Sequence, residues 1–319
     1  MRNSRLRLRL NAGNRAAATW LSIESIWVGI MHNSARVSGA AFLKAYCCEG
    51  NVRILDVGSC DVNGSLRQFQ RPGMEYMGVD IEPGPGVDIV APSADKLPFG
   101  DGDFDAILST STCEHAASFW TLLLEMVRVT KPNGYIYINA PSNGAFHQFP
   151  FDYWRFYPDA GLAFVEWGRK NGCDISLVES GIGAQGQEQW SDFVAVLQKS
   201  GTPRNHGTFI CTPQSSFRNI RRYDTEGVLD HSHETEDQIK IRELNNELSL
   251  AREQQARDED EIGAIKSQLA RAEDLIFALK SGLADGSGNA ESWRSLLGAA
   301  ALRFPARLRE YRARLGERR

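Results

Sequence analysis

The feature that most constrains this chain is a buried-strand pattern followed at once by a glycine turn. Residues 53–57 read Arg-Ile-Leu-Asp-Val, an apolar run of strand length. Gly58 opens a turn that ends near residue 64, and Ser65 suits the start of a helix. In this order, a strand, a turn and a helix put a ligand at the carboxyl edge of a parallel sheet. The sequence therefore predicts an α/β domain.

A second strand pattern indicates the kind of ligand. Residues 76–81 place Asp80 and Ile81 about 20 residues after the first strand, where a carboxylate can hold a ribose diol. The G-x-G-x-x-G spacing that lets a dinucleotide pyrophosphate approach the backbone is absent after Val57. This absence argues against a nicotinamide-dependent oxidoreductase. Asp56 instead suits a cofactor with an amino-acid end, whose ammonium group needs a nearby carboxylate or carbonyl.

Five motifs, in order along the chain, resemble class I S-adenosylmethionine-dependent methyltransferases of the type-11 group. They lie at residues 54–58, 78–81, 94–105, 109–115 and 125–134. The resemblance implies a doubly wound, Rossmann-like sheet of seven strands, with the antiparallel last strand in the segment that runs from Trp190 to Lys199. It also implies methyl transfer with S-adenosyl-L-methionine as the cofactor.

The resemblance carries a set of cofactor-binding residues onto this sequence. They are Asp56, Gly58 and Ser59 for the methionine end, Asp80 and Ile81 for the ribose, Ser93, Ala94 and Asp95 for the adenine, and Thr110 in the loop after the fourth strand. The sequence departs from the family at three places: Cys60 stands where a second glycine is usual, a third glycine is usual near Val62, and Ser93 stands where an adenine-side acid is usual. These departures keep open a second interpretation, a non-catalytic coiled-coil scaffold with a degenerate methyltransferase-like domain.

The segment after the predicted fifth strand is dense in aromatic and polar side chains. Stacking faces beside hydrogen-bonding groups suit a small polyhydroxyl or glycan acceptor, and loops at strand ends carry substrate contacts. The predicted substrate-binding residues are Asn143, Tyr153, Trp154 and Arg155. If the acceptor atom is oxygen, a proton acceptor is needed, and His147 and Asp152 are the candidates. The alternative is a structural helix entry in which Asp152 and Arg155 form a local ion pair.

Composition excludes several other classes of protein. The 36 basic and 40 acidic residues give a net charge of −4, which argues against a nucleic-acid partner. The six cysteines lack C-x-x-C spacing, so we expect no metal site and no disulfide framework, and we expect reduced thiols in a cytoplasmic protein. No apolar run reaches about 18 residues, the length that would indicate a membrane-spanning helix.

The chain divides into six parts by composition. They are a basic segment (1–29), the methyltransferase-like domain (30–200), a polar linker (201–235), a coiled coil (236–280), a flexible or short helical connector (281–303) and a basic amphipathic helix (304–319). The first part fits either a frayed tail or an organelle transit peptide. The last part can lie peripherally on an anionic membrane surface or dock on a partner, and a solvated tail is the alternative.

The coiled coil is predicted from a heptad pattern. Ten of twelve seam positions between Ile241 and Leu279 are apolar, and Gln255 and Asp258 form a polar break that can fix the register or strand number. A helix with such a stripe leaves it exposed unless a partner helix covers it. We therefore expect self-association through this segment.

Overall fold

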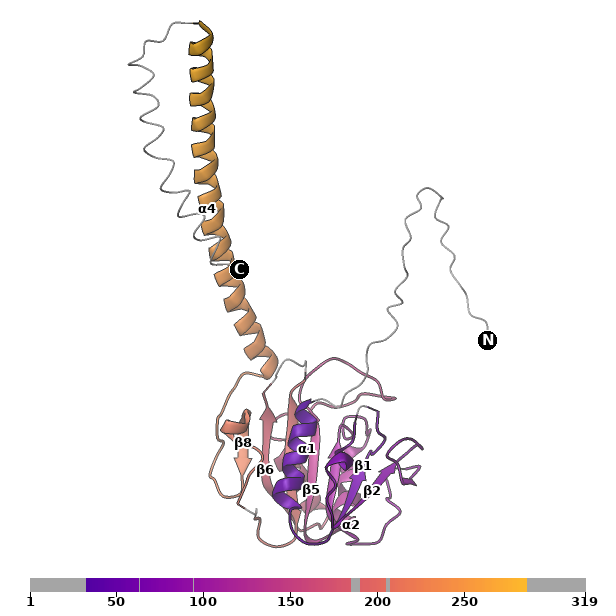
Figure 1. Ribbon diagram of the computed structural model, residues 1–319. Helices are drawn as coiled ribbons and strands as arrows, with labels where there is room; N and C mark the ends of the chain where they lie inside the picture. The colour runs from indigo at the N-terminus through magenta and orange to yellow at the C-terminus, as the bar shows by residue number, and fades with distance from the viewer. Residues whose placement is uncertain (1–32, 63, 94, 185–189, 205–206, 286–319) are drawn as a thin grey trace, which may run out of the picture. The chain divides into compact units, whose positions relative to one another are not determined.

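The computed structural model describes residues 33–62, 64–93, 95–184, 190–204 and 207–285, and its main unit is built on one mixed sheet (Figure 1). The strand order is β3-β2-β1-β4-β5-β7-β6-β8. β1 to β5 are mutually parallel, and β7 runs antiparallel to both β5 and β6. The strands are β1 (Val52–Val57), β2 (Met74–Asp80), β3 (Ile89–Val90), β4 (Phe104–Thr110), β5 (Thr130–Pro141), β6 (Ile175–Gly183), β7 (Asp192–Lys199) and β8 (Phe217–Arg222).

Helices cover both faces of this sheet. α2 (Phe119–Val129) and α3 (Ala160–Lys170) pack their apolar sides on one face. α1 (Asn33–Tyr46) and the short 3₁₀ helix η1 (Leu66–Phe69) pack on the other. Because the chain order reverses between β1 and β4, a crevice is expected outside the carboxyl ends of these two neighbours. The doubly wound α/β prediction is confirmed, including the antiparallel strand between residues 190 and 199.

The sheet differs from the expected one by an added edge strand. β8 pairs antiparallel with β6 and lies inside residues 201–235, the predicted polar linker, together with the 3₁₀ helix η2 (Pro213–Ser215). Its sequence, Phe-Arg-Asn-Ile-Arg-Arg, has only two apolar side chains, which are both buried. A segment this short and polar shows no strand pattern in its sequence. It forms a strand here because the edge of β6 is available to pair with it.

The helix expected after the glycine turn is also shorter than predicted. Ser65 does begin it, and the Ser65 side chain accepts a hydrogen bond from the Arg67 backbone N–H. It then ends as the four-residue η1, because Pro72 and Gly73 follow and β2 begins at Met74.

Two buried carboxylates, each paired with a tyrosine hydroxyl, lie on the face covered by α1. The Tyr76 hydroxyl donates to Asp56 Oδ2 across 2.6 Å and so joins β2 to β1. The Tyr46 hydroxyl donates to Glu179 Oε1 across 2.5 Å. The Glu179 carboxylate also accepts the N–H groups of Ile210 and Cys211, at 3.0 and 2.7 Å. Glu179 therefore holds α1 and the segment before β8 on the sheet.

The second unit begins at Gln238 and contains most of α4 (Glu236–Asp285), a helix of 50 residues. Its helical state agrees with the predicted coiled-coil segment. The apolar seam side chains are about half exposed. They include Ile241, Leu244, Leu248, Ile262, Ile265, Leu269 and Ile276, at 45% to 58%. Within the described residues, no helix combines the length and the apolar character needed to cross a bilayer.

Glu179→Gln tests the anchoring role of this carboxylate. An amide offers one acceptor oxygen where the carboxylate accepts three hydrogen bonds, so we expect a loss of about 1.5–3 kcal/mol in the free energy of unfolding. Urea denaturation would measure this loss, and hydrogen exchange should accelerate at Ile210 and Cys211. Glu75→Gln is the control, because Glu75 makes an exposed ion pair with Arg53. Equal losses in the two variants would contradict the prediction.

Tyr76→Phe tests the other pair through its pH dependence. Burial raises the pKa of Asp56 from 3.8 to about 6. Because the folded chain holds this proton more tightly than the unfolded chain, the free energy of unfolding falls as pH rises between these two values. The Tyr76 hydroxyl lowers that pKa, and removing it should extend the loss to higher pH. We expect destabilisation of about 1.5–3 kcal/mol at pH 8 and less at pH 5, measured by urea denaturation. The exposed Tyr157 supplies the control, Tyr157→Phe, for which the two pH values should give the same small change.

Candidate functional site

The glycine turn after β1 allows no side chain at its first position. Gly58 has a φ of +80°, and a Cβ there would lie 2.1 Å from Thr112 Oγ1. The Gly58 N–H donates to the Val79 carbonyl at 2.9 Å, while Thr112 Oγ1 donates to the Val57 carbonyl at 3.1 Å. The loops after β1 and β4 therefore meet at Gly58, where the absence of a side chain lets Thr112 pack against the turn.

Asp80 ends β2 at the same edge. Its Oδ2 accepts the Cys60 N–H at 2.9 Å, and its Oδ1 accepts the Ile81 N–H at 2.7 Å. The carboxylate is only partly buried. Asp80 thus fixes the glycine turn with two of its lone pairs and keeps others for a hydroxyl donor such as a ribose diol.

Two buried hydroxyls beside this edge have no hydrogen-bond partner among the described residues. They are Ser59 Oγ, in the glycine turn, and Thr110 Oγ1, at the end of β4. Orphaned buried hydroxyls are costly and usually have a ligand or water partner. With Gly58 and Asp80, they make an edge that fits the polar groups of an adenosine cofactor with an amino-acid end. The structure therefore brings together Gly58, Ser59, Asp80, Ile81 and Thr110.

The other predicted cofactor residues lie differently. The Asp56 carboxylate is buried and accepts the Tyr76 hydroxyl, so it serves the contact between β1 and β2. Ser93 and Asp95 lie in an exposed turn after β3, where Ser93 Oγ accepts the Asp95 N–H at 3.0 Å. Ala94 lies outside the described residues.

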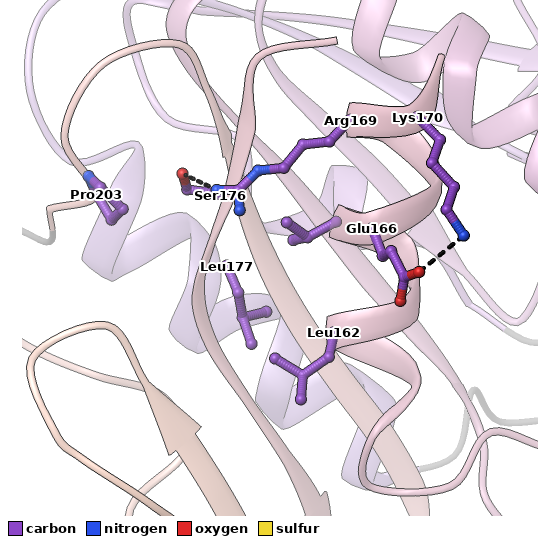
Figure 2. Close-up of a pocket in the computed structure, with 8 residues that line it drawn as sticks. Leu162, Glu166, Arg169, Lys170, Ser176, Leu177 and Pro203 are labelled. Carbon is purple, nitrogen blue, oxygen red and sulfur yellow. Dashed lines mark hydrogen bonds and ion pairs between the residues drawn. The ribbon is translucent and has the colours of Figure 1, made fainter. Parts of the chain in front are cut away.

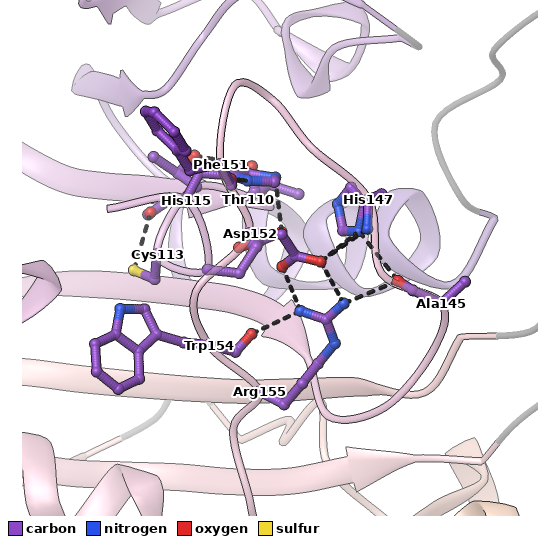
Figure 3. A network of polar contacts seen from close by, with 12 residues as sticks. Thr110, Cys113, His115, Ala145, His147, Phe151, Asp152, Trp154 and Arg155 are labelled. Carbon is purple, nitrogen blue, oxygen red and sulfur yellow. Dashed lines mark hydrogen bonds and ion pairs between the residues drawn. The ribbon is translucent and has the colours of Figure 1, made fainter. Parts of the chain in front are cut away.

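The segment between β5 and α3 folds back onto the loop after β4 (Figure 3). The N–H groups of Tyr153 and Trp154 both donate to the Glu114 carbonyl, at 2.8 and 3.3 Å. The Trp154 indole donates to the Ala116 carbonyl at 3.0 Å and packs edge-on against the Phe119 ring. Tyr153 is exposed, with 46% of its surface accessible. Trp154 is thus a packing residue of this loop, and Tyr153 is open to an acceptor.

Asp152 lies at the centre of this segment and contacts both predicted partners (Figure 3). Its carboxylate accepts two hydrogen bonds from the Arg155 guanidinium, at 2.5 and 2.8 Å. It also accepts a hydrogen bond from the backbone N–H of His147 at 2.9 Å, and its Oδ2 lies 3.3 Å from Nδ1 of the His147 ring. The Arg155 hydrogen bonds lower the pKa of Asp152 to about 2. The ion pair expected under the structural alternative is therefore present, and it also orients His147.

Asn143 bridges three segments of the sheet unit. Its side-chain oxygen accepts the Ser191 N–H at 2.6 Å, and its side-chain nitrogen donates to Asp237 Oδ1 at 2.7 Å. Both ends of the amide are thus engaged within the protein.

Sequence reasoning left two neighbours of His147 out of the predicted site. Glu114 is 1% exposed, and burial raises the pKa of its carboxyl to about 8. His115 is half-buried, and its ring lies edge-on to the ring of His147 with centroids 4.9 Å apart. The sequence Cys-Glu-His marks them only as part of the loop after β4. No spacing along the chain indicates that His147, from the next loop, joins them.

A surface hollow between α3 and β6 lies away from this edge. Figure 2 shows side chains that line it, among them Leu162 and Leu177, and an ion pair of 2.8 Å joins Lys170 to Glu166 there. None of its lining residues belongs to the loops after β1, β2 or β4. We assign no role in the site to this hollow.

Comparisons with known proteins agree with the edge described above. The family profile described as a methyltransferase domain matches residues 55–138. An uncharacterised methyltransferase of Mycobacterium sp. strain JLS is 42% identical over 94 residues, which cover 27% of this chain and 37% of that protein. One from strain KMS is 39% identical with the same coverage. The chain thus spans a little over a third of the length of these curated relatives.

Among solved structures, the 1,6-didemethyltoxoflavin-N1-methyltransferase of Burkholderia thailandensis has a similar fold. Its crystal structure contains 1,6-didemethyltoxoflavin and S-adenosylhomocysteine. It is 18% identical, with a TM-score of 0.43, over 53% of this chain and 80% of that one. The profile match over residues 55–138, on a sheet with this strand order, supports a class I S-adenosylmethionine-dependent methyltransferase domain in the sheet unit.

Proposed function

We propose that this protein transfers a methyl group from S-adenosyl-L-methionine to a hydroxyl of a small-molecule or glycan acceptor. When bound, the cofactor supplies an electrophilic methyl group on a sulfonium sulfur. The residues of this chain would hold that methyl group and the acceptor oxygen in line, exclude water and take up the proton of the acceptor hydroxyl.

The carboxyl edge of β1, β2 and β4 carries this proposal. Asp80 would accept the ribose hydroxyls, and the turn at Gly58 would lie against the methionine end. The orphaned hydroxyls of Ser59 and Thr110 supply two further polar contacts at the same edge. The family profile covers this edge, since it matches residues 55–138.

The acceptor side is proposed from the segment between β5 and α3. Three aromatic side chains there, Phe149, Phe151 and Tyr153, are 46% to 54% exposed and can stack on sugar rings. His147 is the better proton acceptor of the two predicted candidates, because the Arg155 ion pair makes Asp152 a weak base. Asp152 then acts as a positioning residue for the His147 ring.

We also propose that α4 pairs with α4 of a second copy of this chain. Its apolar seam repeats at heptad spacing over most of its 50 residues, and it is about half exposed. A second copy presents the same stripe in the same length, so pairing can bury each seam side chain. The basic segment 304–319, proposed to contact an anionic membrane or a partner, lies outside the described residues.

Calorimetric titration of the full chain with S-adenosylmethionine and S-adenosylhomocysteine tests the proposed cofactor. We expect binding by the wild type and about 10- to 100-fold weaker binding by Asp80→Asn, because a hydrogen bond to a charged group contributes about 1.5–3 kcal/mol. Glu82→Gln, two residues further on, is the matched control and should bind normally. No binding by the folded wild type would reject the proposal and favour the alternative interpretation, a non-catalytic coiled-coil scaffold. Binding would justify an assay of labelled methyl transfer to glycans.

Light scattering after size-exclusion chromatography tests the pairing of α4. The double variant Leu248→Glu/Ile265→Glu should dissociate to monomers, with the dissociation constant raised at least about 100-fold, because each buried aliphatic side chain contributes about 1.5–3 kcal/mol. Leu250→Glu is the control, since Leu250 is exposed but lies off the seam. A monomeric wild type, or equal effects of the seam and off-seam substitutions on dissociation, would contradict this part of the proposal.

A further inference from the structure

Three potential metal ligands converge where the loops after β4 and β5 meet. They are Glu114, His115 and His147, and one ligand atom from each lies within 4.8 Å of the other two. The two histidine rings meet edge-on, and Figure 3 shows both beside Asp152. The residues come from two separate loops, so the cluster exists only in the folded chain.

The buried Glu114 carboxylate has one unsatisfied oxygen. It is 1% exposed, and its Oε2 has no hydrogen-bond partner among the described residues. Its Oε1 lies 3.8 Å from His115 Nε2, beyond hydrogen-bonding distance. Burying a carboxylate without partners is costly, and a cation beside both oxygens would remove that cost.

Both histidines are oriented as metal ligands usually are. His115 Nδ1 contacts the Phe151 carbonyl, which can only accept, so Nδ1 carries the proton and Nε2 keeps a lone pair. His147 Nδ1 lies 3.3 Å from the Asp152 carboxylate, which fixes the same tautomer. A ligating histidine typically donates its second ring N–H to a carbonyl or carboxylate in this way.

We propose that the Glu114 carboxylate and the Nε2 atoms of His115 and His147 bind a divalent transition-metal ion of the zinc class. Two imidazoles and one carboxylate form a known set for catalytic zinc and for ferrous iron, with a position left open. Magnesium and calcium prefer all-oxygen sets, which these residues do not offer. With bonds of about 2.0–2.1 Å, tetrahedral ligand atoms lie about 3.4 Å apart. The three ligand atoms, which lie within 4.8 Å of one another, would therefore move closer by up to about 1.4 Å.

This inference rests on the proposed function for what the ion does, though not for its binding. A hydroxyl in the open position would have its pKa lowered by the cation and would release its proton to water. His147 then serves as a metal ligand, and the cation replaces it as the group that activates the acceptor oxygen.

The test is calorimetric titration of Zn²⁺ into the chelator-treated full chain. We expect one ion per chain. Glu114→Gln and His147→Ala should each weaken binding more than about 100-fold, since changes to groups that only hydrogen-bond a metal ligand already cost about 10- to 100-fold. Circular dichroism and thermal melting would establish that each variant is folded. Co²⁺ should give an absorption spectrum without the charge-transfer band of a thiolate ligand, which separates this site from the six cysteines.

The matched control is the double variant His231→Ala/His233→Ala. These two rings also lie close, with centroids 4.4 Å apart, outside the proposed site. Binding lost in this control, or kept in folded Glu114→Gln and His147→Ala, would overturn the inference.

Methyl transfer that survives chelation but is abolished in His147→Gln would also overturn it, because His147 would then be the proton acceptor. S-adenosylmethionine titrations run in parallel keep the two proposals separate. Failure to bind that cofactor alone would leave the metal result standing.

Discussion

A buried carboxylate must have partners, and this requirement organises one whole face of the sheet. Glu179 accepts hydrogen bonds from Tyr46 on α1 and from the backbone at Ile210 and Cys211. One side chain thereby joins a helix from the start of the domain to a segment near its end. That segment leads into β8, which extends the sheet beyond the predicted seven strands. Asp56 and Tyr76 repeat the same chemistry between β1 and β2.

The turn that follows β1 uses its polar groups differently. There Thr112 packs against Gly58, Asp80 accepts the Cys60 N–H, and the hydroxyls of Ser59 and Thr110 are buried without protein partners among the described residues. The carboxylates of Glu179 and Asp56 are satisfied by protein groups, whereas Ser59 and Thr110 at the proposed cofactor edge each have a hydroxyl without a partner among the described residues. Asp56 belongs to the first group, although its sequence motif suggested the second.

The loops after β4 and β5 concentrate charge and aromatic surface on the acceptor side. Arg155 neutralises Asp152, Asp152 orients His147, and His147 lies edge-on to His115. These contacts leave the neutral His147 ring with one free lone pair, so it cannot bind a proton and a cation there at the same time. It can take a proton or hold a cation, and the buried Glu114 beside it is the basis of our proposal that it holds a cation.

Local patterns were enough to predict the α/β class, the edge at Gly58 and Asp80, and the helix over the heptad repeat, because strand, turn and helix preferences act over a few residues. β8 could not be predicted, since its six residues are mostly polar and become a strand only by pairing with β6. The short η1 reflects Pro72 and Gly73, whose effect depends on where β2 starts. The roles of Asp56, Glu114 and His115 were decided by the tertiary structure alone. A carboxylate or imidazole is defined chemically by its neighbours, and these neighbours come from strands and loops far apart in the sequence.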